Sequence, residues 1–142
     1  YNTVKEHKGN FLEQYSRMPE IADKNSVVCL FSDLFSDPDA VVQTISTISG
    51  TGMYQYIFHI LSNDELYPSK KGLRLFLDPD SEERLLIQCD NIWDEYKREL
   101  NAFINSLNNS VTASGKGRYI LCKEDMSLRD ILLKFFENNP EQ

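Results

Sequence analysis

The sequence predicts a three-layer α/β sandwich built on a mainly parallel sheet. Three apolar runs at 26–32, 53–61 and 118–122 are rich in β-branched and aromatic residues, have the length of strands and are bounded by polar residues. Stretches with helical periodicity separate these runs, and short strand–helix–strand units of this kind form right-handed parallel pairs. A chain of 142 residues is long enough to bury a core of its own. We therefore expect a single domain over residues 1–142.

The first half of the chain predicts a helix, a strand and a second helix. Apolar side chains recur at helical spacing after Asn10, which is a suitable N-cap, and Pro19 is expected to kink or break this helix. The continuous apolar run 26–32 is typical of a strand that is buried on both faces. Asp37 is then placed to cap the next helix, with Pro38 at its first position.

The second half predicts a hairpin insertion, a long helix and a final strand–helix pair. Strands are expected at 73–77 and 83–88, on either side of the turn-forming "DPDS". The helix that begins near Asp90 carries one apolar stripe as far as Val111. Ser127 is expected to cap the last helix. Residues 1–8 and 138–142 have no periodic pattern, and we expect them to be flexible.

Composition narrows the classes of partner. The 22 acidic residues outnumber the 15 basic ones, and the formal charge of −7 opposes nonspecific attraction to nucleic acid or anionic lipid. No run has the roughly 18–20 apolar residues of a membrane-spanning helix. The three cysteines lack metal-type spacing, and those in apolar runs are expected to be buried thiols of a reducing, cytoplasmic compartment.

The stretch "CLFSDLFSDPD" holds the main candidate for chemistry. Asp33 follows the first strand directly, and ligands of parallel sheets bind outside the carboxyl ends of the strands. A carboxylate there, beside Ser32, is able to ligate Mg²⁺ directly or through water. A helix-capping role is the better account of Asp37 and Asp39. The residues alone leave open whether Asp33 is a metal ligand or only a strand end.

Lys123 and His59 are two further candidates for chemistry. Lys123 follows the last strand as Asp33 follows the first, an arrangement similar to that of phosphoacceptor receiver domains. An aspartate-based phosphoacceptor or hydrolase using Asp33 and Lys123 is therefore the alternative function, although the acidic pair that such domains need has no counterpart before residue 26. His59 has no ligand-type neighbour in sequence, and we interpret it as a satisfied histidine of the core or rim.

The order and spacing of several segments resemble one bacterial family. These segments are the strand ending in "SDLF", the "ILSNDEL" loop, the helix containing "WDEYKREL" and "GRYILCKEDMSLRDILLKFF". From about Gly9 to Phe136 the chain resembles the family called domain of unknown function fifty-eight. Its members carry a von Willebrand factor A-like domain and are often encoded beside MoxR-type AAA+ ATPases. The resemblance implies a noncatalytic protein-interaction module, with a MoxR-like AAA+ ATPase as the expected partner.

The resemblance also implies a metal-ion-dependent adhesion site. Asp33 matches the position of that site's last aspartate, and Asn10 stands where the family tends to have a threonine, so that Asp33, Ser32 and Asn10 are the expected Mg²⁺ ligands. The DxSxS strand of the adhesion site is missing, and the chain therefore resembles the carboxyl-terminal part of such a domain. The resemblance leaves open a membrane-associated parent protein. In the usual strand order of the fold, strand 26–32 would have an open edge, and we expect self-association through it.

Overall fold

The computed structural model of the protein describes residues 11–68, 72–77, 84–89 and 92–137. Its centre is a sheet of three parallel strands in the order β1 (Val27–Ser32), β2 (Tyr54–Leu61) and β5 (Gly117–Lys123). Each of the predicted strands is therefore present, and all three run in the predicted parallel sense. The register aligns Ser32, His59 and Leu121 across the sheet, so the three carboxyl ends lie along one edge.

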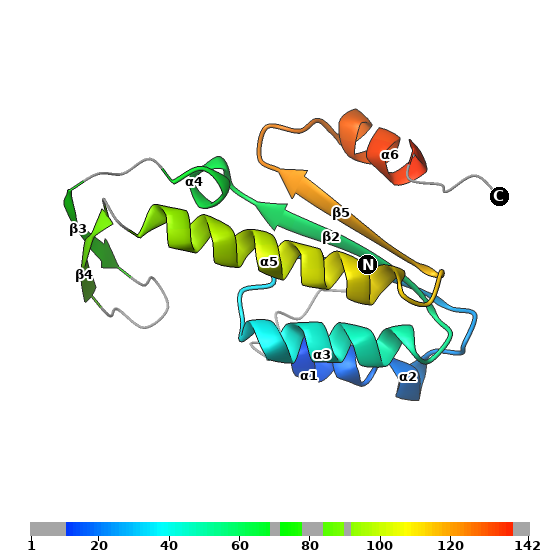
Figure 1. Ribbon diagram of the computed structural model, residues 1–142. Helices are drawn as coiled ribbons and strands as arrows, with labels where there is room; N and C mark the ends of the chain where they lie inside the picture. Colours follow the sequence, from blue (N-terminus) through cyan, green and yellow to red (C-terminus); the bar gives the residue numbers. More distant parts are fainter. Residues whose placement is uncertain (1–10, 69–71, 78–83, 90–91, 138–142) are drawn as a thin grey trace, which may run out of the picture.

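Helices cover the sheet on both sides, which confirms the three-layer α/β fold (Figure 1). Helices α3 (Pro38–Ser49) and α5 (Trp93–Thr112) connect successive strands and lie on the same face, as two right-handed crossovers in one direction require. Helix α6 (Leu128–Glu137) lies on the opposite face. There Phe135 packs against the rings of Tyr56 and Phe58, and its carbonyl accepts a hydrogen bond from Arg118.

Local signals in the sequence set the ends of these helices. The Asp37 side chain accepts a hydrogen bond from the Ala40 N–H at 2.8 Å and Pro38 begins α3, as predicted. Ser127 and Asp130 bond to each other's backbone N–H at the start of α6. Both helices thus start where an oxygen acceptor satisfies N–H groups that have no partner within the helix.

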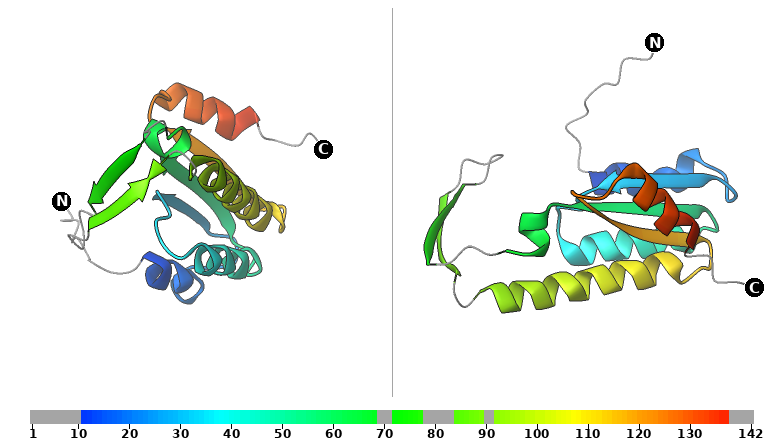
Figure 2. Two further views of the ribbon diagram at one scale, coloured as in Figure 1. Left: turned by 60° about the vertical axis from the view of Figure 1, so that its left-hand side comes forward. Right: turned by 90° about the horizontal axis from the view of Figure 1, so that it is seen from above.

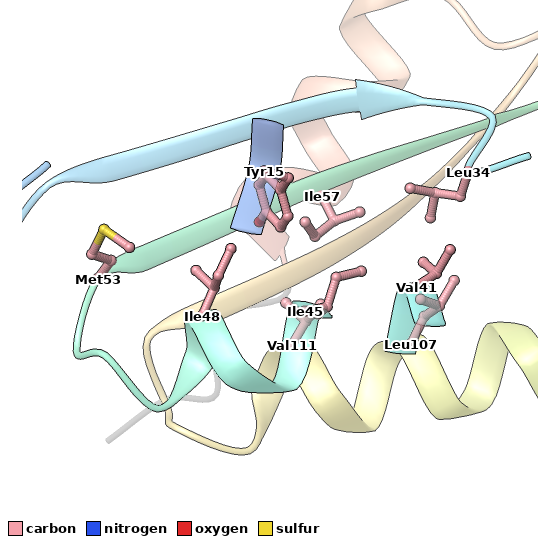
Figure 3. Close-up of a cluster of buried hydrophobic side chains, with 9 residues drawn as sticks. All are labelled: Tyr15, Leu34, Val41, Ile45, Ile48, Met53, Ile57, Leu107 and Val111. Atoms are coloured by element: carbon pink, nitrogen blue, oxygen red, sulfur yellow. The ribbon is translucent and has the colours of Figure 1, made fainter. Parts of the chain in front are cut away.

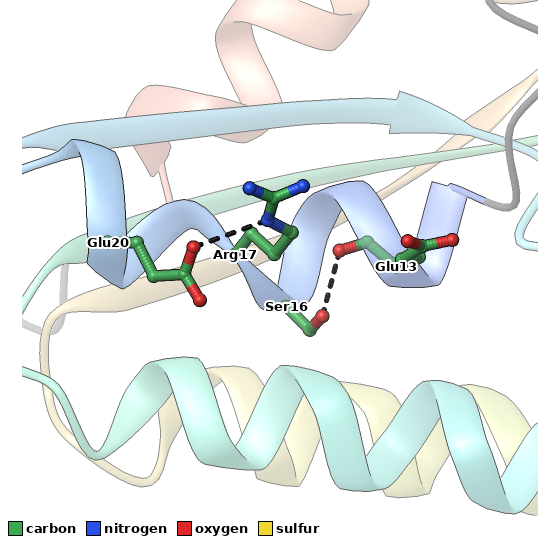
Figure 4. A network of polar contacts seen from close by, with 4 residues as sticks. All are labelled: Glu13, Ser16, Arg17 and Glu20. Atoms are coloured by element: carbon green, nitrogen blue, oxygen red, sulfur yellow. Dashed lines mark hydrogen bonds and ion pairs between the residues drawn. The ribbon is translucent and has the colours of Figure 1, made fainter.

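The predicted first helix is divided in two. Helix α1 (Phe11–Ser16) ends before Arg17, and α2 (Met18–Ile21) carries Pro19 in its first turn, so the proline breaks the helix as expected. Figure 4 shows the polar contacts at this junction, where Ser16 bonds back to the Glu13 carbonyl and Arg17 pairs with Glu20 at 3.2 Å. The ion pair is well exposed and contributes little to stability. Asn10, the expected cap, lies outside the described residues.

The insertion between β2 and α5 is the predicted hairpin. Strands β3 (Leu73–Leu77) and β4 (Arg84–Gln88) pair in antiparallel fashion, and the short helix α4 (Asn63–Leu66) precedes them. Figures 1 and 2 show the hairpin beyond α4 and the start of α5, off the carboxyl end of the sheet. The predicted turn at 78–83 lies outside the described residues. No helix within the described ranges is both long and apolar enough to cross a membrane.

The core fills the space between the sheet and the helices α1, α3 and α5. Figure 3 shows nine buried side chains from four helices and strands and from the loops beside them: Tyr15, Leu34, Val41, Ile45, Ile48, Met53, Ile57, Leu107 and Val111. Most are apolar side chains at helical spacing in α3 and α5. Burial of each such side chain stabilises the fold by roughly 1.5–3 kcal/mol before entropy is counted.

Gln55 and Ser49 are buried polar side chains that together link four elements. Gln55 of β2 accepts a hydrogen bond from the Tyr15 hydroxyl at 2.6 Å, and its amide donates to the Ile45 carbonyl and to Ser49 Oγ. Ser49 in turn donates to the Ser110 carbonyl of α5 at 2.8 Å. A buried group left without such a partner costs roughly 1–3 kcal/mol, so the network fixes how α1, α3 and α5 sit on β2.

The prediction that strand 26–32 is buried on both faces is wrong. Alternate residues Val27, Cys29 and Phe31 of β1 are exposed, with Val27 at 56% and Phe31 at 64%. The reason is the position of β1 at the edge of the sheet: α6 packs on Tyr56 and Phe58 of β2, one strand further in. The expectation of a buried thiol is therefore wrong for Cys29, which is exposed at this edge, whereas Cys89 and Cys122 are buried.

We expect the chain to self-associate through the open edge of β1. Within the described residues β1 pairs only with β2, and its outer side is uncharged. We predict that two chains pair antiparallel at this edge about a twofold axis, so that light scattering gives a dimer mass. The variant Phe31→Lys should then restore a monomer, because a charged side chain disfavours edge pairing. The control Phe136→Lys, at a similarly exposed position of α6, should remain a dimer. A clean monomer of the wild-type chain at moderate concentration contradicts the prediction.

Candidate functional site

The chain turns sharply at the end of β1, and two side chains hold the turn. Ser32 Oγ accepts a hydrogen bond from the Leu34 N–H at 3.0 Å, and Asp33 Oδ1 accepts one from the Phe35 N–H at 3.1 Å. Leu34 adopts a left-handed backbone with φ of 55°. In this conformation the turn sends adjacent side chains in opposite directions: Leu34 is 2% exposed and Phe35 is 86% exposed.

Burial of Leu34 accounts for the strained backbone. A left-handed conformation costs a residue other than glycine roughly 1–2 kcal/mol. Leu34 belongs to the core cluster shown in Figure 3. Burial of a leucine side chain stabilises the folded state by roughly 1.5–3 kcal/mol, which offsets the cost of the left-handed backbone. Packing of Leu34 in the core therefore fixes the turn, and as a consequence Phe35 lies at the surface.

His59 fixes the same turn from the centre of the sheet. It is 1% exposed on β2, where its Nε2 lies 3.0 Å from the Asp33 carbonyl oxygen and its Nδ1 lies 2.7 Å from the Tyr119 hydroxyl. A carbonyl only accepts, so Nε2 carries the proton and Nδ1 accepts from Tyr119. Desolvation by burial lowers the pKa of His59, despite the opposing effects of the Asp33 carbonyl and the Asp33 and Glu65 carboxylates. The ring is therefore neutral, with both nitrogens in use.

A cleft of about 470 Å³ opens beside this turn, at the carboxyl ends of β1 and β2. We call it the strand-end cleft. Its lining residues are Asp33, Leu34, Phe35, Ser36, Pro38, Asp39, Val42, His59, Leu61, Glu65, Tyr96, Glu99, Leu100, Ala102, Phe103 and Ser106. The volume lies within the roughly 300–1,000 Å³ of ligand pockets, and the position is where parallel sheets bind ligands.

Helix α5 forms one wall of the cleft with a single face. Tyr96, Leu100 and Phe103 are spaced so that they lie above one another on the helix, and each is only partly buried. Phe103 meets the His59 ring edge to face at 6.0 Å. Phe35 and the start of α3, with Pro38 and Val42, contribute further apolar side chains to the lining.

Four acidic side chains line the same cleft, one from each surrounding segment. Asp33 comes from the turn, Asp39 from α3, Glu65 from α4 and Glu99 from α5, and all four residues are exposed. Glu65 Oε2 also accepts from the backbone N–H and hydroxyl of Ser62, an arrangement that caps α4. No lysine or arginine occurs among the lining residues that the structure describes.

The expected magnesium ligands are brought together only in part. Asp33 and Ser32 are adjacent, but Ser32 Oγ and one Asp33 oxygen are occupied within the turn, and Asn10 lies outside the described residues. Across residues 11–68, 72–77, 84–89 and 92–137, no group of three or more His, Cys, Asp or Glu side chains is placed to hold a metal ion. These residues alone do not fit a magnesium site, which would need ligands from elsewhere.

Lys123, the second residue of the phosphoacceptor alternative, is directed to another partner. Its amine donates to the Tyr67 hydroxyl at 2.8 Å and lies over that ring, and this contact raises the pKa of Lys123. Strand β2 separates β1 from β5, and Lys123 is not among the residues that line the strand-end cleft.

Several residues of the cleft were missed by sequence reasoning. The apolar stripe predicted for this helix does not distinguish Tyr96, Leu100 and Phe103, which line the cleft, from Leu107 and Val111, which are buried. Glu65 and Glu99 carried no signal, because only the packing of α4 and α5 brings them to Asp33.

Comparisons of the chain with protein-family models, with curated proteins and with solved structures found no match. Inferences about the strand-end cleft therefore rest on its geometry and chemistry.

The neutral state of His59 makes stability depend on pH in a defined window. The unfolded chain takes up a proton on His59 near pH 6.5, whereas the folded chain takes it up only at lower pH. Stability is thus complete above about pH 6.5 and falls as the pH drops below it, by up to about 1.4 kcal/mol per pH unit for one proton. Urea denaturation between about pH 7.5 and 5.5 measures this loss.

A variant of His59 isolates its contribution. His59→Gln should be less stable than wild type but should have a flatter pH dependence. An unchanged slope in His59→Gln would show that the imidazole is not held neutral by burial.

Proposed function

We propose that this protein is a noncatalytic interaction module that binds a segment of a protein partner in the strand-end cleft. The observation that carries the proposal is Phe35, an aromatic side chain that is 86% exposed at the rim of the cleft. Its backbone is fixed by the bond to Asp33, and buried Leu34 anchors the turn from the other side. Rigid aromatic side chains beside a concave apolar surface are the residues that dominate binding energy at protein interfaces.

The contacts of the cleft favour binding over chemistry. His59 could act as a general base only through a ring nitrogen that faces the reactants, but both of its nitrogens are bonded to the protein itself. The phosphoacceptor alternative needs a lysine beside the acceptor aspartate, and the Lys123 amine bonds to Tyr67. The surface that remains for a ligand consists of apolar side chains and exposed carboxylates.

The resemblance to the von Willebrand factor A-like family extends this proposal. It implies a MoxR-like AAA+ ATPase as the partner, and strand order β1-β2-β5 is compatible with the carboxyl-terminal part of such a domain. It also implies Mg²⁺ at Asp33. Because the described residues do not complete that site, we propose magnesium only as an ion whose remaining ligands include a carboxylate of the partner.

Photocrosslinking tests the proposal at the residue that carries it. A benzoylphenylalanine at position 35 places the reactive group at the cleft, and the same residue at position 136 places it on α6, which does not line the cleft. We expect a discrete protein adduct from position 35 in extracts of the source cells and none from position 136. If Mg²⁺ takes part, Asp33→Ala should abolish any increase in adduct that Mg²⁺ causes.

Two results would contradict the proposal. Identical adducts from positions 35 and 136 would show that the cleft has no special role. A stable beryllofluoride adduct at Asp33 would instead support the phosphoacceptor alternative.

A further inference from the structure

The charge around the strand-end cleft is of one sign. Its four carboxylates, Asp33, Asp39, Glu65 and Glu99, give a formal charge of −4 at neutral pH, and the one imidazole in the lining, His59, is neutral. Walls of low polarity concentrate the field of such a group within a concave surface. The cleft is therefore a region of negative potential with an apolar interior.

Contacts within the protein offset this charge only in part. Arg98 reaches Glu99 at 3.6 Å, but the same guanidinium also contacts Glu95 at 3.3 Å, and all three side chains are about 70% exposed. Such exposed pairs are weak. Asp33 and Glu65 accept hydrogen bonds from uncharged backbone and hydroxyl groups, which leave their formal charge unchanged. A ligand that enters the cleft meets the remaining negative charge.

The spacing of the acids argues against a single ion as the ligand. They come from four different segments, and no three of the described carboxylates are grouped closely enough to hold a metal ion. Without a bound Mg²⁺, phosphate groups and acidic peptides would be repelled by all four. Several separate positive charges, arranged around an apolar group, match both the spread of the acids and the apolar walls between them.

We propose that the occupant of the strand-end cleft is a segment of a partner protein with an apolar anchor side chain flanked by lysine or arginine. The anchor packs between Phe35 and the α5 face formed by Tyr96, Leu100 and Phe103, and the flanking cations meet the carboxylates at the rim. This inference rests on the proposed function, because it presumes that the cleft binds a protein. It adds the chemistry by which the partner is selected.

Selection from a phage library of random peptides on the full chain tests this chemistry. We expect the enriched peptides to carry Lys or Arg beside a large apolar residue, and their binding to weaken with added salt. The variant Asp39→Asn/Glu99→Gln removes two rim charges with little change in shape. We expect it to weaken binding on the order of tenfold, as loss of two exposed charge contacts implies.

Control variants make each result decisive. Glu13→Gln/Asp23→Asn removes the same charge from exposed positions outside the cleft and should leave affinity unchanged. This inference would be overturned by acidic or uncharged peptides whose binding requires Phe35 but does not change in Asp39→Asn/Glu99→Gln. The proposed function would then remain intact. If no enriched peptide loses binding in Phe35→Ala, the proposed function itself is overturned.

Discussion

The structure depends on two polar side chains that are buried on the face of β2 covered by α3 and α5. Gln55 and His59 lie two positions on either side of Ile57, and each must find hydrogen-bond partners within the protein because water does not reach them. Gln55 binds Tyr15, Ile45 and Ser49, and so determines how α1 and α3 lie on the sheet. His59 binds Tyr119 of β5 and the Asp33 carbonyl, and so connects the opposite edge of the sheet to the turn after β1.

The strand-end cleft depends on the hydrogen bond between His59 and the Asp33 carbonyl. With the Asp33 carbonyl held by His59 and Leu34 drawn into the core, the turn has one arrangement, and that arrangement places Phe35 in solvent beside the α5 wall. Contacts within the protein thus fix the backbone that carries Asp33 and Phe35. A fixed backbone reduces the entropy lost on binding, which supports the proposal that the cleft binds a partner.

The strand pattern predicted the architecture well because continuous apolar runs and N-caps are local signals. The break at Pro19, the cap at Asp37 and the hairpin strands follow from residues a few positions apart. Exposure of β1 could not be predicted in this way, since it depends on where α6 packs. Asp33 was found from its place after a strand. The remainder of the cleft was not, because only the packing of α4 and α5 brings Glu65, Tyr96 and Glu99 to the cleft that Asp33 lines.

Hydrogen exchange of side-chain amides, followed by NMR, tests most directly whether the polar groups of β2 are closed off within the core. The Gln55 amide donates to Ile45 and Ser49 in the buried network, whereas Gln43 is exposed on α3. The account predicts that the Gln55 amide protons exchange only when the protein unfolds, and that those of Gln43 exchange at the rate of a free amide. Equal, rapid exchange of both amides would contradict it.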